Sequence, residues 1–138
     1  SLAIEHYQQA LERHPEQEAQ VLLNLALAWK QAGRPELAIH TLSQVVALDP
    51  GQNRARAEWA ELLLEAGRHG EAAQLFEEAV ARDPQYARAW FGLARALEGI
   101  KHREQAAGAY RRFLELWQTP DSRAVLARER LEALEVNR

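Results

Sequence analysis

The segment AAQLFEEAVARDP, residues 72–84, decides the fold of this chain. Ala72, Phe76 and Ala79 follow one another at intervals of four and three residues, which places them on one stripe of a helix. Pro84 ends such a helix, because proline lacks an N–H and restricts the residue before it. The segment therefore predicts a helix with one packed face and a defined end.

The same series of small and large apolar residues occurs at three other places. Its members are Ala3, Tyr7, Ala10 and Pro15; Ala38, Leu42, Val45 and Pro50; and Ala106, Tyr110 and Phe113, with Gln118 in the place of the proline. The prolines are 35 and 34 residues apart. Self-similarity at a fixed period of roughly 20–50 residues indicates a repeat protein.

A second helical pattern with the same period lies between these segments. Its members are Leu22, Leu25, Ala26 and Trp29; Arg56, Trp59, Ala60 and Leu63; and Trp90, Leu93, Ala94 and Leu97. Gly33 and Gly67 follow two of these segments and suit left-handed helix caps. Pro35 suits the first turn of the next helix. The chain therefore alternates two kinds of helix: helix A carries this second pattern and helix B carries the first.

The two patterns together resemble the tetratricopeptide repeat (TPR), most clearly in the segment 90–93 of helix A and in 72–84 of helix B. Ala26, Ala60 and Ala94 stand where the family pattern has glycine, and Arg56 stands where it has a bulky apolar residue. The resemblance covers nearly the whole chain. It implies an all-α fold, a right-handed superhelical solenoid of antiparallel helix pairs.

We expect a single domain built from five segments. They are an orphan helix B at 2–14, three repeats at 18–48, 53–82 and 87–117, and a capping helix at 120–136. Thr119 is the expected N-cap of the last helix, with Pro120 in its first position. Ala124, Ala127, Leu131 and Leu134 form one apolar stripe there, which leaves a polar outer face of the kind that a terminal cap requires.

Composition narrows the function classes. The net charge of −3 makes nucleic acid a poor partner. The longest apolar stretch, residues 21–29, is too short to cross a bilayer, so direct membrane insertion is not expected. The chain has no cysteine, which excludes disulfides and thiolate metal sites. It does not begin with methionine and contains none, so we interpret it as a fragment of a longer protein. Arginine outnumbers lysine 15 to 2, which favours a bacterial source. Cytoplasm and periplasm are both compatible.

No constellation of residues points to catalysis. The five histidines are not placed at metal-ligand spacing, no serine lies in a nucleophile-elbow context, and no glycine-rich phosphate loop is present. We therefore predict neither an enzyme nor a cofactor or metal site.

The resemblance instead implies a groove that binds a protein or peptide, because A helices line the concave face of TPR proteins. By register, the groove residues are Leu23, Leu27, Lys30, Arg54, Glu61, Arg88, Phe91 and Arg95, with Gln20, Ala57, Leu64 and Glu98 beside them and Val125 and Glu129 added by the last helix. Leucine at 23 and 27 does not support the clamp with which some members hold a C-terminal carboxylate. The alternative reading of these positions is a solvated mixed face.

Two hypotheses for function stay open at this point. The first is a non-catalytic interaction scaffold, part of a longer bacterial array in envelope assembly or polysaccharide export, whose partner carries apolar anchors and some negative charge. The second is a substrate-recruiting or regulatory segment of a larger enzyme. We further expect Phe91→Ala to weaken binding without loss of stability, and the uncovered first helix to self-associate.

Overall fold

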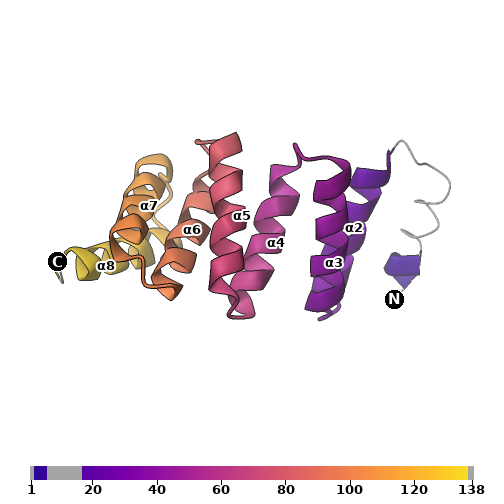
Figure 1. Cartoon of the computed structure of the whole chain (residues 1–138), viewed down its shortest axis with the longest axis horizontal. Helices are drawn as coiled ribbons and strands as arrows, with labels where there is room; N and C mark the ends of the chain where they lie inside the picture. The colour runs from indigo at the N-terminus through magenta and orange to yellow at the C-terminus, as the bar shows by residue number, and fades with distance from the viewer. Residues whose placement is uncertain (1, 6–16, 137–138) are drawn as a thin grey trace. The chain divides into compact units, whose positions relative to one another are not determined.

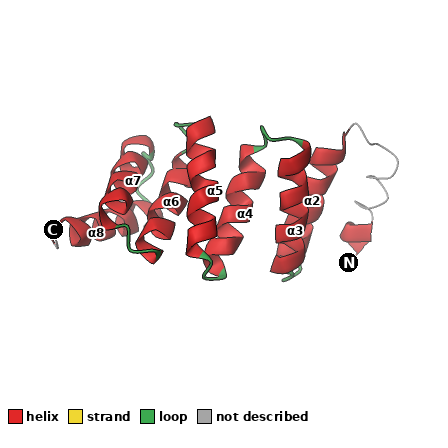
Figure 2. Cartoon of the chain, in the orientation of Figure 1, coloured by secondary structure: helices red, strands yellow, loops and turns green. Residues whose placement is uncertain are grey.

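A computed structural model describes residues 2–5 and 17–136 of the chain. Seven helices follow a short helical segment at residues 2–5 (Figures 1 and 2). They are α2 (Glu18–Gln31), α3 (Pro35–Leu48), α4 (Asn53–Glu65), α5 (His69–Arg82), α6 (Ala87–Gly99), α7 (Arg103–Leu116) and α8 (Ser122–Val136). The described residues contain no strand, so the prediction of an all-α fold is confirmed. Most of the predicted helix at 2–14 lies outside the described residues.

The chain divides into two compact units, Ser1–Leu62 and Leu63–Arg138. We call them the N-terminal unit and the C-terminal unit. The division falls within α4, whose last turn belongs to the C-terminal unit.

In the N-terminal unit, α2 packs against α3. Ala38, Leu42 and Val45, the repeat series of α3, are almost completely buried. Leu22, Leu25 and Ala26 of α2 join them in one apolar cluster with Ile4, while Trp29 and Trp59 pack against that cluster and stay partly exposed. The periodic residues therefore form the core of this unit, because their spacing places them on facing helical stripes.

In the C-terminal unit, α6 packs between α5 and α7, and α8 packs against α7. The largest side chains of the B-helix series, Phe76, Tyr110 and Phe113, are fully buried. Trp90 is partly buried and its indole Nε1 donates a hydrogen bond to the carbonyl of Pro84 at 2.9 Å. That hydrogen bond ties the start of α6 to the turn after α5.

Three turns between A and B helices have the same backbone structure. Gly33 and Gly67 take left-handed φ values of 74° and 79°, as their sequence positions predict, and Lys101 takes the equivalent place with φ 64°. Each of these residues donates its N–H to a carbonyl three residues earlier, and the next residue donates to a carbonyl five residues earlier. This is the Schellman pattern that satisfies the last carbonyls of a helix. Lys101 was not expected here, because the equivalent residue in the other two turns is glycine.

The start of α8 differs from the prediction. Asp121, not Thr119, is the N-cap residue, because its carboxylate accepts the N–H groups of Arg123 and Ala124, both at 3.1 Å. The same carboxylate oxygen accepts the indole N–H of Trp117 at 3.1 Å. The side chain of an N-cap residue accepts the free N–H groups of the first helical turn. Thr119 lies two residues earlier in the chain, too far from these groups to cap the helix.

Within the described ranges, the helices are each too short or too polar to cross a membrane.

Candidate partner-binding surfaces

Three residues that the repeat register predicts to line the groove are buried in the structure. Leu23 belongs to the core cluster of the N-terminal unit with 3% of its surface exposed, and Ala57 and Leu64 are buried as well. Leu27 packs against the same cluster and is only partly exposed. The A helices are buried over a wider arc than their repeat stripe indicates, so these leucines stabilise the fold and Leu23 is not available to a partner.

Lys30 is held by an ion pair within the N-terminal unit. Its Nζ lies 3.0 Å from Oε2 of Glu58, which links α2 to α4. The Glu58 side chain is only 5% exposed, so Lys30 supplies a charge partner that this buried carboxylate requires. The charge of Lys30 therefore stabilises the fold through this ion pair.

Arg54 and Glu61 lie on α4 in the N-terminal unit. Glu61 is partly buried and already interacts with another residue. Arg54 is exposed and makes no ion pair or side-chain hydrogen bond with a described residue. Arg54 is therefore the predicted groove residue of this unit whose charge is open to a partner.

Phe91 is a core residue of the C-terminal unit. It is 8% exposed, its ring centroid lies 4.9 Å from that of Phe113, and it meets Tyr110 edge-on at 6.4 Å. The guanidinium of Arg95 lies over the same ring, with Cζ 5.7 Å from the ring centroid. This is a cation–π geometry, and it positions an exposed arginine on an apolar surface.

Arg88 and Arg95 both belong to α6, but they differ in availability. Arg88 is half-buried and already has an interaction with another residue. Arg95 is exposed, and its ring contact leaves its N–H donors free for a carboxylate. Of the predicted residues in this unit, Arg95 is the one best placed to contact a partner.

A charged network between α6, α7 and α8 was not predicted. Glu98 of α6 accepts hydrogen bonds from Arg130 of α8, with Nη2 to Oε2 at 2.6 Å, and from the buried hydroxyl of Tyr110 of α7 at 2.7 Å. Burial opposes ionisation of Glu98, but the hydrogen bonds from Arg130 and Tyr110 outweigh it and lower the pKa of the carboxyl. Burial and the Glu98 carboxylate raise the pKa of Tyr110, so its hydroxyl remains a donor. Glu98 is therefore a structural residue and not an open groove residue.

One sequence signal could have pointed to this network. The B-helix series has Leu42, Phe76 and Tyr110 at equivalent positions. A buried tyrosine hydroxyl nearly always has a hydrogen-bond partner, and Glu98 is within its reach. No such sequence signal indicated Arg130, because α8 lies outside the repeat pattern.

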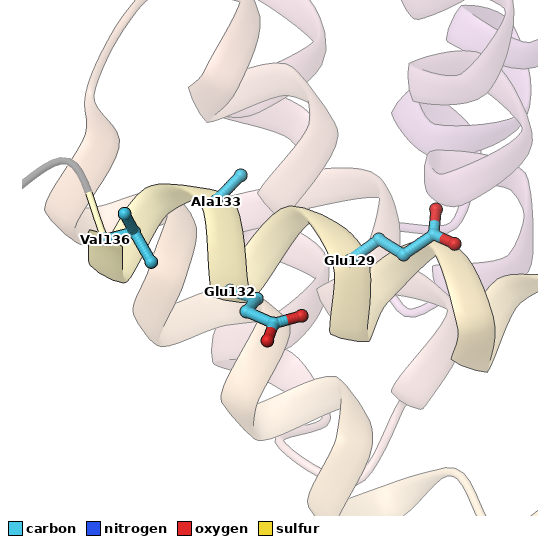
Figure 3. Close-up of a pocket in the computed structure, with 4 residues that line it drawn as sticks. All are labelled: Glu129, Glu132, Ala133 and Val136. Atoms are coloured by element: carbon cyan, nitrogen blue, oxygen red, sulfur yellow. The ribbon is translucent and has the colours of Figure 1, made fainter.

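The outer face of α8 is more apolar than a capping helix requires. Val125, Leu126 and Val136 are 50%, 38% and 77% exposed. The last two turns of the helix border a surface depression of about 400 Å³, lined by Glu129, Glu132, Ala133 and Val136 (Figure 3). The expected polar outer face is thus a mixed face of apolar and acidic side chains.

Within the described ranges, no three histidine, aspartate or glutamate side chains are grouped so that they could hold a metal ion. The residues that carry chemistry here are instead exposed arginines and glutamates at the surfaces of helices α4, α6 and α8. Such groups can bind the charged side chains of another polypeptide.

Comparisons with known proteins agree with this architecture. The sequence model of a family described as tetratricopeptide repeat matches residues 1–62 and again 63–131. No curated protein sequence matches the chain at a significant level.

Solved structures with a similar fold include the crystal structure of MamA, with a TM-score of 0.84 and 21% identity over 97% of this chain and 75% of that one. They also include the first TPR of Spaghetti (RPAP3) bound to the HSP90 peptide SRMEEVD, with a TM-score of 0.79 and 21% identity over 88% and 93% of the two chains. The second TPR domain of human RPAP3, in complex with the HSP70 peptide SGPTIEEVD, gives 0.77 and 19% over 88% and 98%.

Proposed function

Because this chain belongs to the tetratricopeptide repeat family, we propose that it is a non-catalytic scaffold that binds a partner polypeptide through exposed residues of its A helices. Two proteins of similar fold are complexes with short peptides, which supports a polypeptide as the class of ligand. The sequence identity to each of them is about a fifth. That level of identity supports a shared fold but indicates no particular partner.

The observation that carries the proposal is the pair formed by Phe91 and Arg95. The buried ring supports the guanidinium from one side at 5.7 Å, while the arginine itself is exposed. An arginine held in this way loses little further side-chain entropy when it binds a carboxylate. Arginine is also enriched among the residues that dominate binding energy at interfaces.

The expected partner segment carries a carboxylate next to an apolar side chain. The carboxylate would pair with Arg95 of the C-terminal unit, and a second acidic segment could pair with the open Arg54 of the N-terminal unit. The SRMEEVD and SGPTIEEVD peptides in the similar complexes combine these two kinds of residue. The burial of Leu23 and the core packing of Leu27 still argue against the carboxylate clamp known in the family.

Binding of a labelled short peptide of leucine and glutamate tests the proposal by fluorescence anisotropy. Charge reversal in Arg88→Glu/Arg95→Glu is expected to weaken binding on the order of tenfold or more, as for the loss of a true anchor. The matched control is Arg34→Glu/Arg82→Glu, which makes the same change in net charge at two exposed residues, the N-cap residue before α3 and the last residue of α5. An equal loss in the control would assign binding to net charge and refute the surface on α6.

A substrate-recruiting role in a larger enzyme needs the same surface. It differs only in what lies outside residues 1–138, so the binding experiment applies to both classes of function.

A further inference from the structure

Helix α8 carries a second unassigned surface, formed by the side chains that face away from its buried stripe. Val125, Glu129, Glu132, Ala133 and Val136 follow one another at intervals of four, three, one and three residues. These intervals keep them on one side of a helix for three turns, about 16 Å at 1.5 Å per residue. We call this set, together with the adjacent Leu126, the α8 outer face.

The apolar content of the α8 outer face is not needed to hold α8 in place. The helix is anchored through the opposite side, where Ala124, Ala127 and Leu134 are buried and Arg130 binds Glu98. Six large apolar side chains are exposed in the described chain, and three of them, Val125, Leu126 and Val136, lie on this one helix. Large exposed apolar groups gathered on one element mark an interaction site more often than scattered ones do.

The charges on the α8 outer face are acidic and open. Neither Glu129 nor Glu132 makes an ion pair or side-chain hydrogen bond with a described residue, whereas Glu135 on the flank pairs with Arg111 at 3.2 Å. Two nearby cations are engaged elsewhere: Arg130 binds Glu98 and Arg123 lies over the ring of Trp117. Arg128 is exposed at the edge of the face and makes no ion pair with either glutamate. As far as the structure describes the chain, the face therefore presents two carboxylates without an ion-pair partner beside apolar side chains.

We propose that the α8 outer face docks an amphipathic helix of a partner protein, whose apolar stripe is flanked by lysine or arginine. The depression of about 400 Å³ beside Ala133 and Val136 would receive an apolar side chain, and the flanking cations would pair with Glu129 and Glu132. A helix fits because three turns of a helical stripe offer ridges and grooves to another helix. The proposal rests on the proposed scaffold function and adds a binding surface of opposite charge to that of Arg95.

Two labelled peptides test this surface in the whole 138-residue chain. One is a helical peptide with a leucine stripe flanked by lysines, and the other is its twin with glutamates in place of the lysines. Anisotropy titrations are expected to show binding of the lysine peptide and a loss on the order of tenfold or more in Glu129→Lys/Glu132→Lys. The glutamate twin is expected to gain affinity for this double variant.

The matched control is Glu65→Lys/Glu77→Lys, which changes net charge equally at exposed glutamates of α4 and α5. Equal binding of the lysine peptide to the wild type and to Glu129→Lys/Glu132→Lys, or no binding to the wild type, overturns the proposal. So does a change in the mass of the free protein on that substitution, measured by light scattering, because a second copy would then be the occupant.

The two proposals fail separately. If Arg88→Glu/Arg95→Glu loses the acidic peptide while Glu129→Lys/Glu132→Lys keeps the lysine peptide, the scaffold function stands and the α8 outer face is wrong. The reverse result would retain the α8 outer face and reject the surface on α6.

Discussion

Arg130 of α8 binds the carboxylate of Glu98 in α6 through two guanidinium nitrogens, Nε at 3.1 and 3.2 Å and Nη2 at 2.6 Å. The Glu98 side chain is 21% exposed and that of Arg130 is 43% exposed. The pair is charge-assisted and two-pronged, which is stronger than an ordinary surface ion pair. It joins the last helix to the helix before α7 and so completes the packing of the C-terminal unit.

Removing the guanidinium should therefore destabilise the C-terminal unit. Arg130→Met keeps the apolar stem of the side chain but leaves the Glu98 carboxylate with Tyr110 as its remaining side-chain donor. We expect a loss of about 1–2 kcal/mol in urea unfolding. Arg112→Met, which removes an exposed pair with Glu115, should cost less than about 0.5 kcal/mol. Equal losses would show that the link from α6 to α8 has no special role.

The same pair makes stability depend on pH. Burial raises the pKa of Glu98, but hydrogen bonds from Arg130 and Tyr110 lower it overall, so the folded value lies below the unfolded value of about 4.3. The contribution is therefore fully present above the unfolded pKa and is lost as pH falls through the folded one. Urea midpoints of the wild type and Arg130→Met should differ at neutral pH and converge in acid. A constant difference would contradict this assignment.

The sequence predicted the fold because its repeat residues are the core residues. Ala38, Leu42 and Val45 recur with Ala72, Phe76 and Ala79 at a fixed period, and all six are buried. The sequence did not predict which residues beside the repeat stripe of an A helix are exposed. Leu23 lies off the repeat stripe and is buried all the same, because A helices are covered on more than one side.

Interactions outside the repeat could be predicted less well. Asp121 caps α8 and Arg130 binds Glu98 through geometry that no internal copy reveals, since α8 has no equivalent in the earlier segments. Register placed Arg95 among the expected groove residues, whereas its support by the buried Phe91 ring depends on the tertiary packing of α6 against α7.

A glycine at position 101 should stabilise the chain. Lys101 has φ 64° in the turn where the equivalent residues are Gly33 and Gly67, and the left-handed region costs a non-glycine residue roughly 1–2 kcal/mol. Some of this gain is lost to the greater freedom of glycine in the unfolded chain, so we expect Lys101→Gly to add about 0.5–1 kcal/mol. Thermal unfolding measures it, and Lys101→Ala controls for the removed charge. A gain in the alanine variant alone would contradict the backbone explanation.

A methyl group at position 92 should destabilise the C-terminal unit. A Cβ on Gly92 would overlap the ring of Phe76, which is fully buried and cannot move aside easily. We expect Gly92→Ala to cost about 1–3 kcal/mol through overpacking. Gly108→Ala in α7, where a Cβ meets no atom within 4 Å, should be neutral or stabilising. A smaller residue at position 76, such as Leu in Phe76→Leu/Gly92→Ala, should recover part of the loss.

Phe91→Ala should unfold the C-terminal unit more easily, contrary to the expectation that register alone supports. The ring is 8% exposed and contacts Phe113 and Tyr110, so its removal leaves a cavity and should cost about 3–5 kcal/mol. Arg95→Glu replaces an exposed side chain above that ring, and its unfolding free energy should change by less than about 1 kcal/mol. Urea unfolding of both variants measures the contrast. A stable Phe91→Ala protein would place the ring on an open surface, and Phe91 itself would then be the anchor for a partner. If instead Arg95→Glu is as unstable as Phe91→Ala, the arginine belongs to the fold and the binding surface on α6 loses its main residue.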